Sequence, residues 1–280
     1  MREVHVNDIT QAVAKMCIAT NVKISPDILE GLKKSQKLES SPIGIDILDQ
    51  LLQNAEIAER KNMPICQDTG MAVVFVEIGQ EVSISGGLLT DAINEGVRKG
   101  YEEGYLRKSI VEDPFFRVNT NDNTPAVIHY DIVGGDSLKI SLSPKGFGSE
   151  NMSRIYMLKP SDGIEGAKRV ILETIDMAGP NACPPMVVGV GIGGTFEKAA
   201  ILAKKALIRP IDQSSDITYV SNLEKELTKK ANQLGIGPQG MGGRTTVLGI
   251  NIETFPTHIA GLPVAINISC HVTRHMSVSL

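Results

Sequence analysis

The sequence predicts an α/β fold, with mixed sheets flanked by helices and a helical N-terminal portion. Apolar residues recur at helical spacing up to about residue 62, and short apolar strands alternate with helices beyond it. No fixed-period repeat or low-complexity linker interrupts the chain. Its 280 residues, 42% hydrophobic and 21% charged, are enough to build a sizeable core. That length allows one large domain or two modest ones, and we expect one over residues 1–280.

The N-terminal portion contains two apolar sets at helical spacing, and the polar residues 33–42 between them are predicted to form a loop. The sets are Ile9, Val13, Met16 and Cys17, and then Ile47, Leu48, Leu51, Leu52, Ala55 and Ala58. We therefore expect helices on both sides of a polar loop.

After residue 64, strands and helices are expected to alternate. The expected strands are 71–78, 127–133, 138–142, 186–190, 246–253 and 262–269, and the expected helices are 90–105, 164–177 and 196–208. Ser221 and Glu224 have the spacing of a capping box at the start of a further helix, which Gly235 would end. Residues 143–151 are expected to be a glycine-bearing loop.

Charge and composition exclude two classes of partner. The formal net charge is −4, only 4% of residues are aromatic and Trp is absent, which argues against nucleic-acid binding. The N-terminus has no apolar signal core, and no stretch reaches the ~20 apolar residues that span a bilayer. We expect a cytoplasmic protein that binds neither nucleic acid nor membrane.

The four cysteines are few and widely separated, which favours reduced thiols or metal ligands over a disulfide framework. Cys17 lies on an apolar helical stripe and is expected to be a buried core thiol. Cys66, Cys183 and Cys270 instead lie at element boundaries, in PICQDTG, PNACPP and NISCHVTRH, where loops can converge. Three thiolates suit an iron–sulfur cluster. The separations between these three cysteines match no compact cluster motif. On the residues alone, ordinary thiols that bind no metal are therefore the alternative to cluster ligands.

Gly189, Gly191 and Gly194 formally fit the G-x-G-x-x-G pattern between a strand and a helix. A dinucleotide-binding fold also needs a second strand that ends in an acidic residue about 20 residues further on. A polar loop over residues 209–216 follows instead. We favour a tight strand-to-helix turn with close backbone packing, and an NAD-dependent oxidoreductase is the alternative.

Six segments together resemble the class I fumarate hydratase family, in particular its separate α subunits, and they are also similar to L(+)-tartrate dehydratase α subunits. The segments are CQDTG at 66–70, DNTPA at 122–126, KGFGSEN at 145–151, NACPP at 181–185, GIGGT at 191–195 and PTHIAGLPVAINISCHVTR at 256–274. The resemblance runs from about residue 5 to the C-terminus.

The resemblance implies specific roles for residues of this chain. It makes Cys66, Cys183 and Cys270 the ligands of a [4Fe–4S] cluster in which one iron lacks a protein ligand and binds substrate. Asp68, the implied catalytic residue, would both contact substrate and help to orient the proton-transfer machinery. The remaining implied substrate-binding residues are Gln67, Arg107, Gly146, Gly148 and His258.

Simpler readings of several of these residues exist without the resemblance. Asp68 equally fits an Asx turn before Thr-Gly, and Arg107 fits a solvated charge at a helix end. Gly146 and Gly148 fit a plain turn, and a lone histidine such as His258 is more often structural.

The resemblance also implies a reaction and a partner. We expect a hydro-lyase that hydrates fumarate reversibly to (S)-malate, a step of the tricarboxylic acid cycle, with tartrate dehydration to oxaloacetate as the alternative. The chain stops soon after its third cluster cysteine, so a separate β subunit is expected to supply the catalytic base, in an α2β2 heterotetramer. A non-catalytic iron–sulfur protein is an alternative from another functional class.

Overall fold

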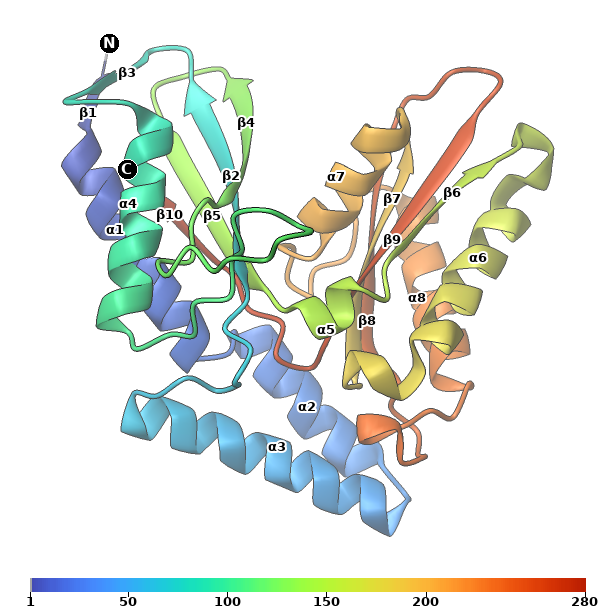
Figure 1. Ribbon diagram of the computed structural model, residues 1–280. Coiled ribbons are helices and arrows are strands. Elements are labelled where there is room, and N and C mark those ends of the chain that lie inside the picture. Colours follow the sequence, from blue (N-terminus) through green and yellow to red (C-terminus); the bar gives the residue numbers. More distant parts are fainter. Residues whose placement is uncertain (1) are drawn as a thin grey trace. The chain divides into compact units, whose positions relative to one another are not determined.

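The structure, a computed structural model, describes residues 2–280, which form two compact units (Figure 1). Unit 1 contains residues 2–25, 55–147 and 274–280, and unit 2 contains residues 26–54 and 148–273. Each unit has a four-stranded sheet of mixed direction with helices packed on it, so the α/β prediction is confirmed. Within residues 2–280, no helix is both long and apolar enough to cross a membrane.

Unit 1 is built on the sheet β10-β5-β2-β4, in which β2 runs parallel to β4 and antiparallel to β5. A separate parallel pair is formed by β1 and β3. The strands are β1 (Arg2–His5), β2 (Met71–Gly79), β3 (Val82–Ser85), β4 (Val127–Val133), β5 (Leu138–Lys145) and β10 (Met276–Ser279). The helices α1 (Val6–Val22) and α4 (Leu89–Glu103) pack with this sheet around one apolar core.

Two glycines of α4 allow it to approach α1 closely. A Cβ at Gly96 would lie 2.7 Å from Val13 Cβ, and one at Gly100 would lie 2.7 Å from Cys17 Cβ. The α1 residues that face α4 and the sheet are fully buried, as the helical spacing of the first apolar set predicts. The two helices therefore form one tightly packed pair.

Unit 2 is built on the sheet β6-β9-β7-β8. Helix α7 covers one face of this sheet, and α6 and α8 cover the other (Figure 1). The strands are β6 (Arg154–Leu158), β7 (Met186–Gly193), β8 (Val247–Phe255) and β9 (Leu262–Ser269). Its helices are α2 (Pro26–Leu38), α6 (Gly163–Ala178), α7 (Phe196–Ala206) and α8 (Thr218–Asn232), with short 3₁₀ turns at Pro160–Asp162, Gly179–Ala182 and Pro238–Gly240. Helix α3 (Pro42–Lys61) begins in unit 2 and ends in unit 1, and α5 (Phe147–Glu150) begins in unit 1 and ends in unit 2.

The glycines of β7 serve the packing of α7 on the sheet. A Cβ at Gly189 would lie 2.1 Å from Ala203 O, and one at Gly191 would lie 2.1 Å from Ala199 O. No side chain fits at either position without moving the helix backbone. The interpretation of this glycine pattern as close backbone packing is confirmed.

Three local predictions are wrong. Residues 33–38 belong to α2, because its buried Ile28 and Leu32 hold one face of the helix against unit 2. In the expected loop over 143–151, β5 continues to Lys145 by pairing with Met71, and α5 follows. The third error is the capping box, because Ser221 and Glu224 lie inside α8 rather than at its start.

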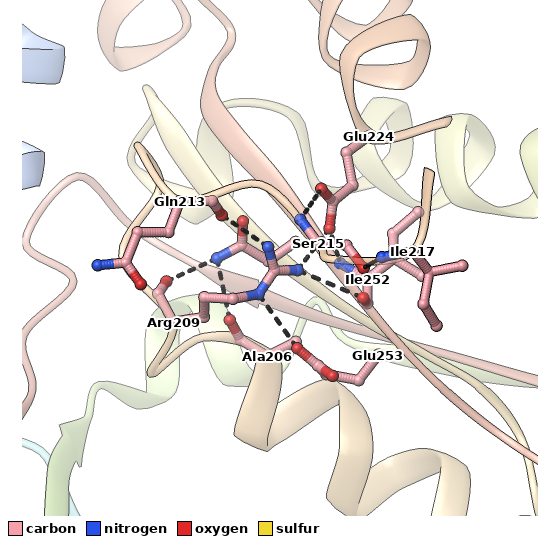
Figure 2. Close-up of polar contacts among 9 residues, drawn as sticks. Ala206, Arg209, Gln213, Ser215, Ile217, Glu224, Ile252 and Glu253 are labelled. Carbon is pink, nitrogen blue, oxygen red and sulfur yellow. Dashed lines mark hydrogen bonds and ion pairs between the residues drawn. The ribbon is translucent and has the colours of Figure 1, made fainter. Parts of the chain in front are cut away.

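Glu224 makes tertiary contacts instead of a cap (Figure 2). Its carboxylate accepts hydrogen bonds from Ile252 N at 2.8 Å and Ser215 N at 3.2 Å, and it pairs with the Arg209 guanidinium. Arg209 Nε also donates to Glu253 Oε1 at 3.1 Å. This network fastens the loop after α7 to both α8 and β8.

Candidate functional site

The segment Cys66–Gly70 of unit 1 connects α3 to β2 and carries three of the predicted site residues. The Cys66 thiol is partly exposed and lies 3.2 Å from Gln67 Oε1. Asp68 N donates to Cys66 Sγ at 3.4 Å. Gln67 is exposed, so its amide is available to a ligand.

The Asp68 carboxylate is fixed by two backbone amides. Oδ1 accepts from Gly70 N at 2.9 Å, which is the predicted Asx turn, and Oδ2 accepts from Phe147 N at 2.9 Å. A Cβ at Gly146 would lie 3.2 Å from Asp68 Oδ2, so a side chain there would crowd the carboxylate. The structure therefore brings Asp68 and Gly146 together. Each oxygen keeps a further lone pair, so the carboxylate can still accept a proton or a hydrogen bond.

Buried side chains hold the other side of this segment. Tyr101 Oη donates to Thr69 O at 2.6 Å, and Asn123 Nδ2 donates to Gly70 O at 3.2 Å. Burial raises the pKa of the Tyr101 hydroxyl far above its usual range, so it remains a donor. Thr69 Oγ1 in turn donates to Arg107 O at 2.9 Å, which places the exposed Arg107 next to the segment.

Arg274 is a member of the site that sequence reasoning misses. It is 2% exposed, and its Nη2 donates to Asp68 O at 2.6 Å. Its Nη1 donates to Asn21 Oδ1 at 2.8 Å. The residue closes the motif CHVTR, but nothing in that motif indicates that this arginine is buried.

In unit 2, sheet register brings Cys183 and Cys270 together. Val187 of β7 pairs with Ser269 of the antiparallel β9, so the residue segments before β7 and after β9 share one sheet edge. His271 N donates to Cys183 O at 3.3 Å, and its ring Nδ1 lies 3.0 Å from the same oxygen.

The cysteine-bearing loop of unit 2 has an exposed and strained backbone. Cys183 is exposed and has a φ of +51°, in the left-handed region that residues with a side chain rarely adopt. Cys270 is partly exposed. Gln239 Nε2 donates to Pro184 O at 2.7 Å and lies 3.2 Å from His271 Nδ1, which braces the loop.

Gly148 and His258, also in unit 2, have fewer contacts. Gly148 is exposed, and a Cβ there would meet no atom within 4 Å, so space does not require glycine. His258 is exposed on the loop between β8 and β9, where its Nδ1 accepts from Ala260 N at 3.2 Å. The same histidine lines an apolar cavity of about 410 Å³ with Ile164, Tyr219 and neighbouring residues.

Cys17 and the loop cysteines differ in their capacity to bind metal. Cys17 is completely buried, and burial raises the pKa of its thiol to about 12, which keeps it protonated. The three loop thiols are exposed or partly exposed, and sulfur is the donor that iron–sulfur clusters use. Among residues 2–280, no group of three His, Cys, Asp or Glu side chains is placed so that it could hold a metal ion. The accessible thiols are those of Cys66 in unit 1 and of Cys183 and Cys270 in unit 2.

Comparisons with known proteins match nearly the whole chain to one family. The family model described as "Fumarate hydratase (Fumerase)" matches residues 10–279. A putative L(+)-tartrate dehydratase subunit alpha of Methanocaldococcus jannaschii is 43% identical over 271 residues, which cover 95% of each chain. The L(+)-tartrate dehydratase subunit alpha of Escherichia coli K12 is 34% identical over 273 residues, which cover 96% of this chain and 89% of the relative.

Proposed function

Since this chain belongs to the fumarate hydratase family and is a hydro-lyase, we propose that it is the α subunit of an iron–sulfur enzyme that reversibly hydrates fumarate to (S)-malate. The observation that carries the proposal is the Asp68 carboxylate, which two backbone amides fix two residues from the Cys66 thiol. The proposal treats residues 1–280 as one functional subunit. It assigns the catalytic step to a site that holds an anionic substrate, a carboxylate and a metal ligand.

The proposed cofactor is a [4Fe–4S] cluster held by Cys66, Cys183 and Cys270. The donor set fits, because all three thiols are accessible and the fourth cysteine of the chain is buried. When bound, a cluster with three protein ligands supplies an open iron that acts as a Lewis acid toward the substrate hydroxyl and carboxylate.

The residues around Cys66 would bind and orient the substrate. The exposed Gln67 amide would hydrogen-bond the substrate, and the Asp68 carboxylate would accept a hydrogen bond from the substrate hydroxyl on a free lone pair. The Arg107 guanidinium can hold a substrate carboxylate bidentately, which a lysine cannot. Gly146, Gly148 and His258 complete the proposed substrate site.

A partner subunit is part of the proposal. The similar proteins from M. jannaschii and E. coli are named alpha subunits, which supports a β subunit for this chain too. We assign the catalytic base to that subunit and expect a cytoplasmic α2β2 assembly. The α chain with intact cluster would then hydrate fumarate far more slowly than the complex.

L-Tartrate is the second candidate substrate. It is favoured by the names of the two relatives, a putative L(+)-tartrate dehydratase subunit alpha and an L(+)-tartrate dehydratase subunit alpha. Tartrate carries one more hydroxyl group than malate, and a site built to hydrogen-bond that hydroxyl would reject the analogue that lacks it. Steady-state kinetics with both substrates therefore separates the two readings.

The test begins with iron and acid-labile sulfide per chain in anaerobically prepared protein. About four of each supports the cluster, and hydration of fumarate by the complex with the β subunit supports the reaction. A cluster without turnover on fumarate or L-tartrate would favour a non-catalytic iron–sulfur protein. No iron or sulfide after anaerobic reconstitution would overturn the proposal, and NAD binding in calorimetry would then favour the oxidoreductase.

A further inference from the structure

Arg274 is a buried cation that no carboxylate pairs with. It is 2% exposed, and its guanidinium donates to Asp68 O and Asn21 Oδ1, while its own carbonyl accepts from Ser143 Oγ at 2.8 Å. Over residues 2–280 it makes no ion pair, and its Nε is buried without a hydrogen-bond partner. A buried charge without a counter-ion is costly, and a neutral amide could donate to two oxygens without that cost. We therefore expect the guanidinium to have a role other than packing.

Its two hydrogen bonds hold both sides of Cys66. Nη2 holds the carbonyl of Asp68, two residues after the cysteine. Nη1 holds the side chain of Asn21, whose carbonyl accepts from Ile65 N at 2.9 Å, one residue before the cysteine. The planar, forked guanidinium presents two donors in fixed directions to these two oxygens, which the ammonium group of a lysine does not.

The neighbouring carbonyls are held by neutral side chains. Tyr101 holds Thr69 O and also lies 2.9 Å from Gly70 O, which Asn123 holds as well. Arg274 is thus the one charged member of the set that holds the three consecutive carbonyls of residues 68–70. Of these side chains, Arg274 is the one whose hydrogen bond is to Asp68 itself.

We propose that Arg274 is a positioning residue for the hydration site, which holds the backbone around Cys66 and thereby orients the Asp68 carboxylate. Its positive charge also offsets part of the negative charge of the Asp68 carboxylate. The role in hydration rests on the proposed function, whereas the role in ordering residues 65–70 does not.

The first experiment measures amide hydrogen exchange in the α chain without any ligand. We compare wild type, Arg274→Gln, Arg274→Lys and the control Arg60→Gln, which changes an exposed arginine of α3. In Arg274→Gln, exchange at residues 65–70 is expected to rise about tenfold or more, because a charge-assisted hydrogen bond is lost. The melting temperature should fall only by the few degrees that loss of one buried hydrogen bond causes, and exchange in β2 should stay close to wild type. Arg60→Gln should change neither region. Exchange that rises throughout unit 1, or that stays unchanged at 65–70, would overturn the proposal.

The second experiment uses the complex with its β subunit and cluster. Arg274→Gln is expected to lower kcat about 100-fold, as misplacement of a reacting group does, with KM and iron content near wild type. Arg274→Lys, which keeps the charge but not the fork, should fall between the two. Wild-type kcat in Arg274→Gln would contradict the role.

The outcomes separate this inference from the proposed function. If the wild-type complex turns over neither fumarate nor L-tartrate, the proposed function fails, but hydrogen exchange still decides whether Arg274 orders residues 65–70. If Arg274→Gln does not fold, Arg274→Lys is judged by the same exchange criterion. If neither variant folds, Arg274 has a purely structural role and the inference is wrong.

Discussion

The two units hold their candidate ligand cysteines by different means. In unit 2, the pairing of Val187 with Ser269 sets the segments before β7 and after β9 at one sheet edge. Backbone hydrogen bonds of the sheet thus bring Cys183 and Cys270 together. In unit 1, Cys66 lies in a connection between a helix and a strand, and buried side chains hold that connection.

This difference indicates where single substitutions will matter. Sheet register is shared among many backbone bonds, so no one side chain carries it. A loop held by side chains depends on each of them, since removal of one leaves a buried carbonyl without its donor, at about 1–3 kcal/mol. We therefore expect unit 1 to be sensitive at its polar side chains and unit 2 at its close-packed backbone.

The largest expected effect tests whether both regions serve one cofactor. Cys66→Ser, Cys183→Ser and Cys270→Ser should each abolish retention of iron, because a cluster held by three thiolates has no spare protein ligand. Cys17→Ala should keep the wild-type iron content, since that thiol is buried and protonated. Iron and sulfide analysis after anaerobic reconstitution measures both. Full iron content in any one of the three serine variants would show that the substituted cysteine is not a cluster ligand.

The next largest effect concerns the backbone packing of unit 2. In Gly191→Ala, the new Cβ would lie 2.1 Å from Ala199 O and 2.6 Å from Ala203 N, so α7 must move away from β7. We expect the free energy of unfolding to fall by about 3 kcal/mol, measured by urea denaturation. Gly148→Ala is the matched control, because its Cβ meets no atom within 4 Å. Equal stability of the two variants would refute this account of β7.

A smaller effect compares the side chains that hold the two loops. Tyr101→Phe removes a buried donor from Thr69 O, and we expect a loss of about 2 kcal/mol in unfolding free energy. Gln239→Ala should lose only about 0.5 kcal/mol, because Pro184 O also accepts from Gln239 backbone N at 2.8 Å. Thermal and urea unfolding measure both variants. A larger loss in Gln239→Ala would reverse the comparison between the units.

Sequence reasoning predicts the elements that have a strong apolar pattern. The strand β4 is predicted with its observed bounds, and β2, α6 and β9 are predicted to within about a residue at each end. It misses β1, β3, β6 and β10, which are four or five residues long and pair with strands far away along the chain. Such strands bury little surface themselves, so their pattern is weak until the partner is known.

The site divides in a similar way. The Cys66–Asp68 segment and Gly146 are found from the sequence, and the structure joins Asp68 to the Gly146 turn. Tyr101 and Arg274 are not found, because an isolated tyrosine or arginine gives no sign that it will be buried against a carbonyl. Their role depends on the tertiary fold, which composition and periodicity do not specify. The functional roles of all the predicted site residues stay predictions. These residues are Cys66, Gln67, Asp68, Arg107, Gly146, Gly148, Cys183, His258 and Cys270.

The last expected effect, smaller than that of Tyr101→Phe, contrasts Cys17 with the loop cysteines and appears only at alkaline pH. Burial raises the pKa of Cys17 to about 12 from its ordinary value of 9.0. Above pH 9 the unfolded chain releases this proton while the folded chain keeps it, so stability falls as pH rises. At pH 10 this one thiol should lower the free energy of unfolding by about 1.4 kcal/mol relative to neutral pH.

Urea unfolding of wild type and Cys17→Ala at pH 7, 8, 9 and 10 isolates this contribution. The variant should lose less stability than wild type between pH 8 and pH 10, since it has no thiol to titrate there. Iodoacetamide at pH 9 gives a second measurement: in the folded apo chain it should label the accessible loop cysteines and leave Cys17 unmodified, because only a thiolate reacts. Equal pH dependence in the two proteins, or rapid labelling of Cys17, would show that α1 and α4 do not shield this thiol. Their packing would then be looser than Gly96 and Gly100 make it.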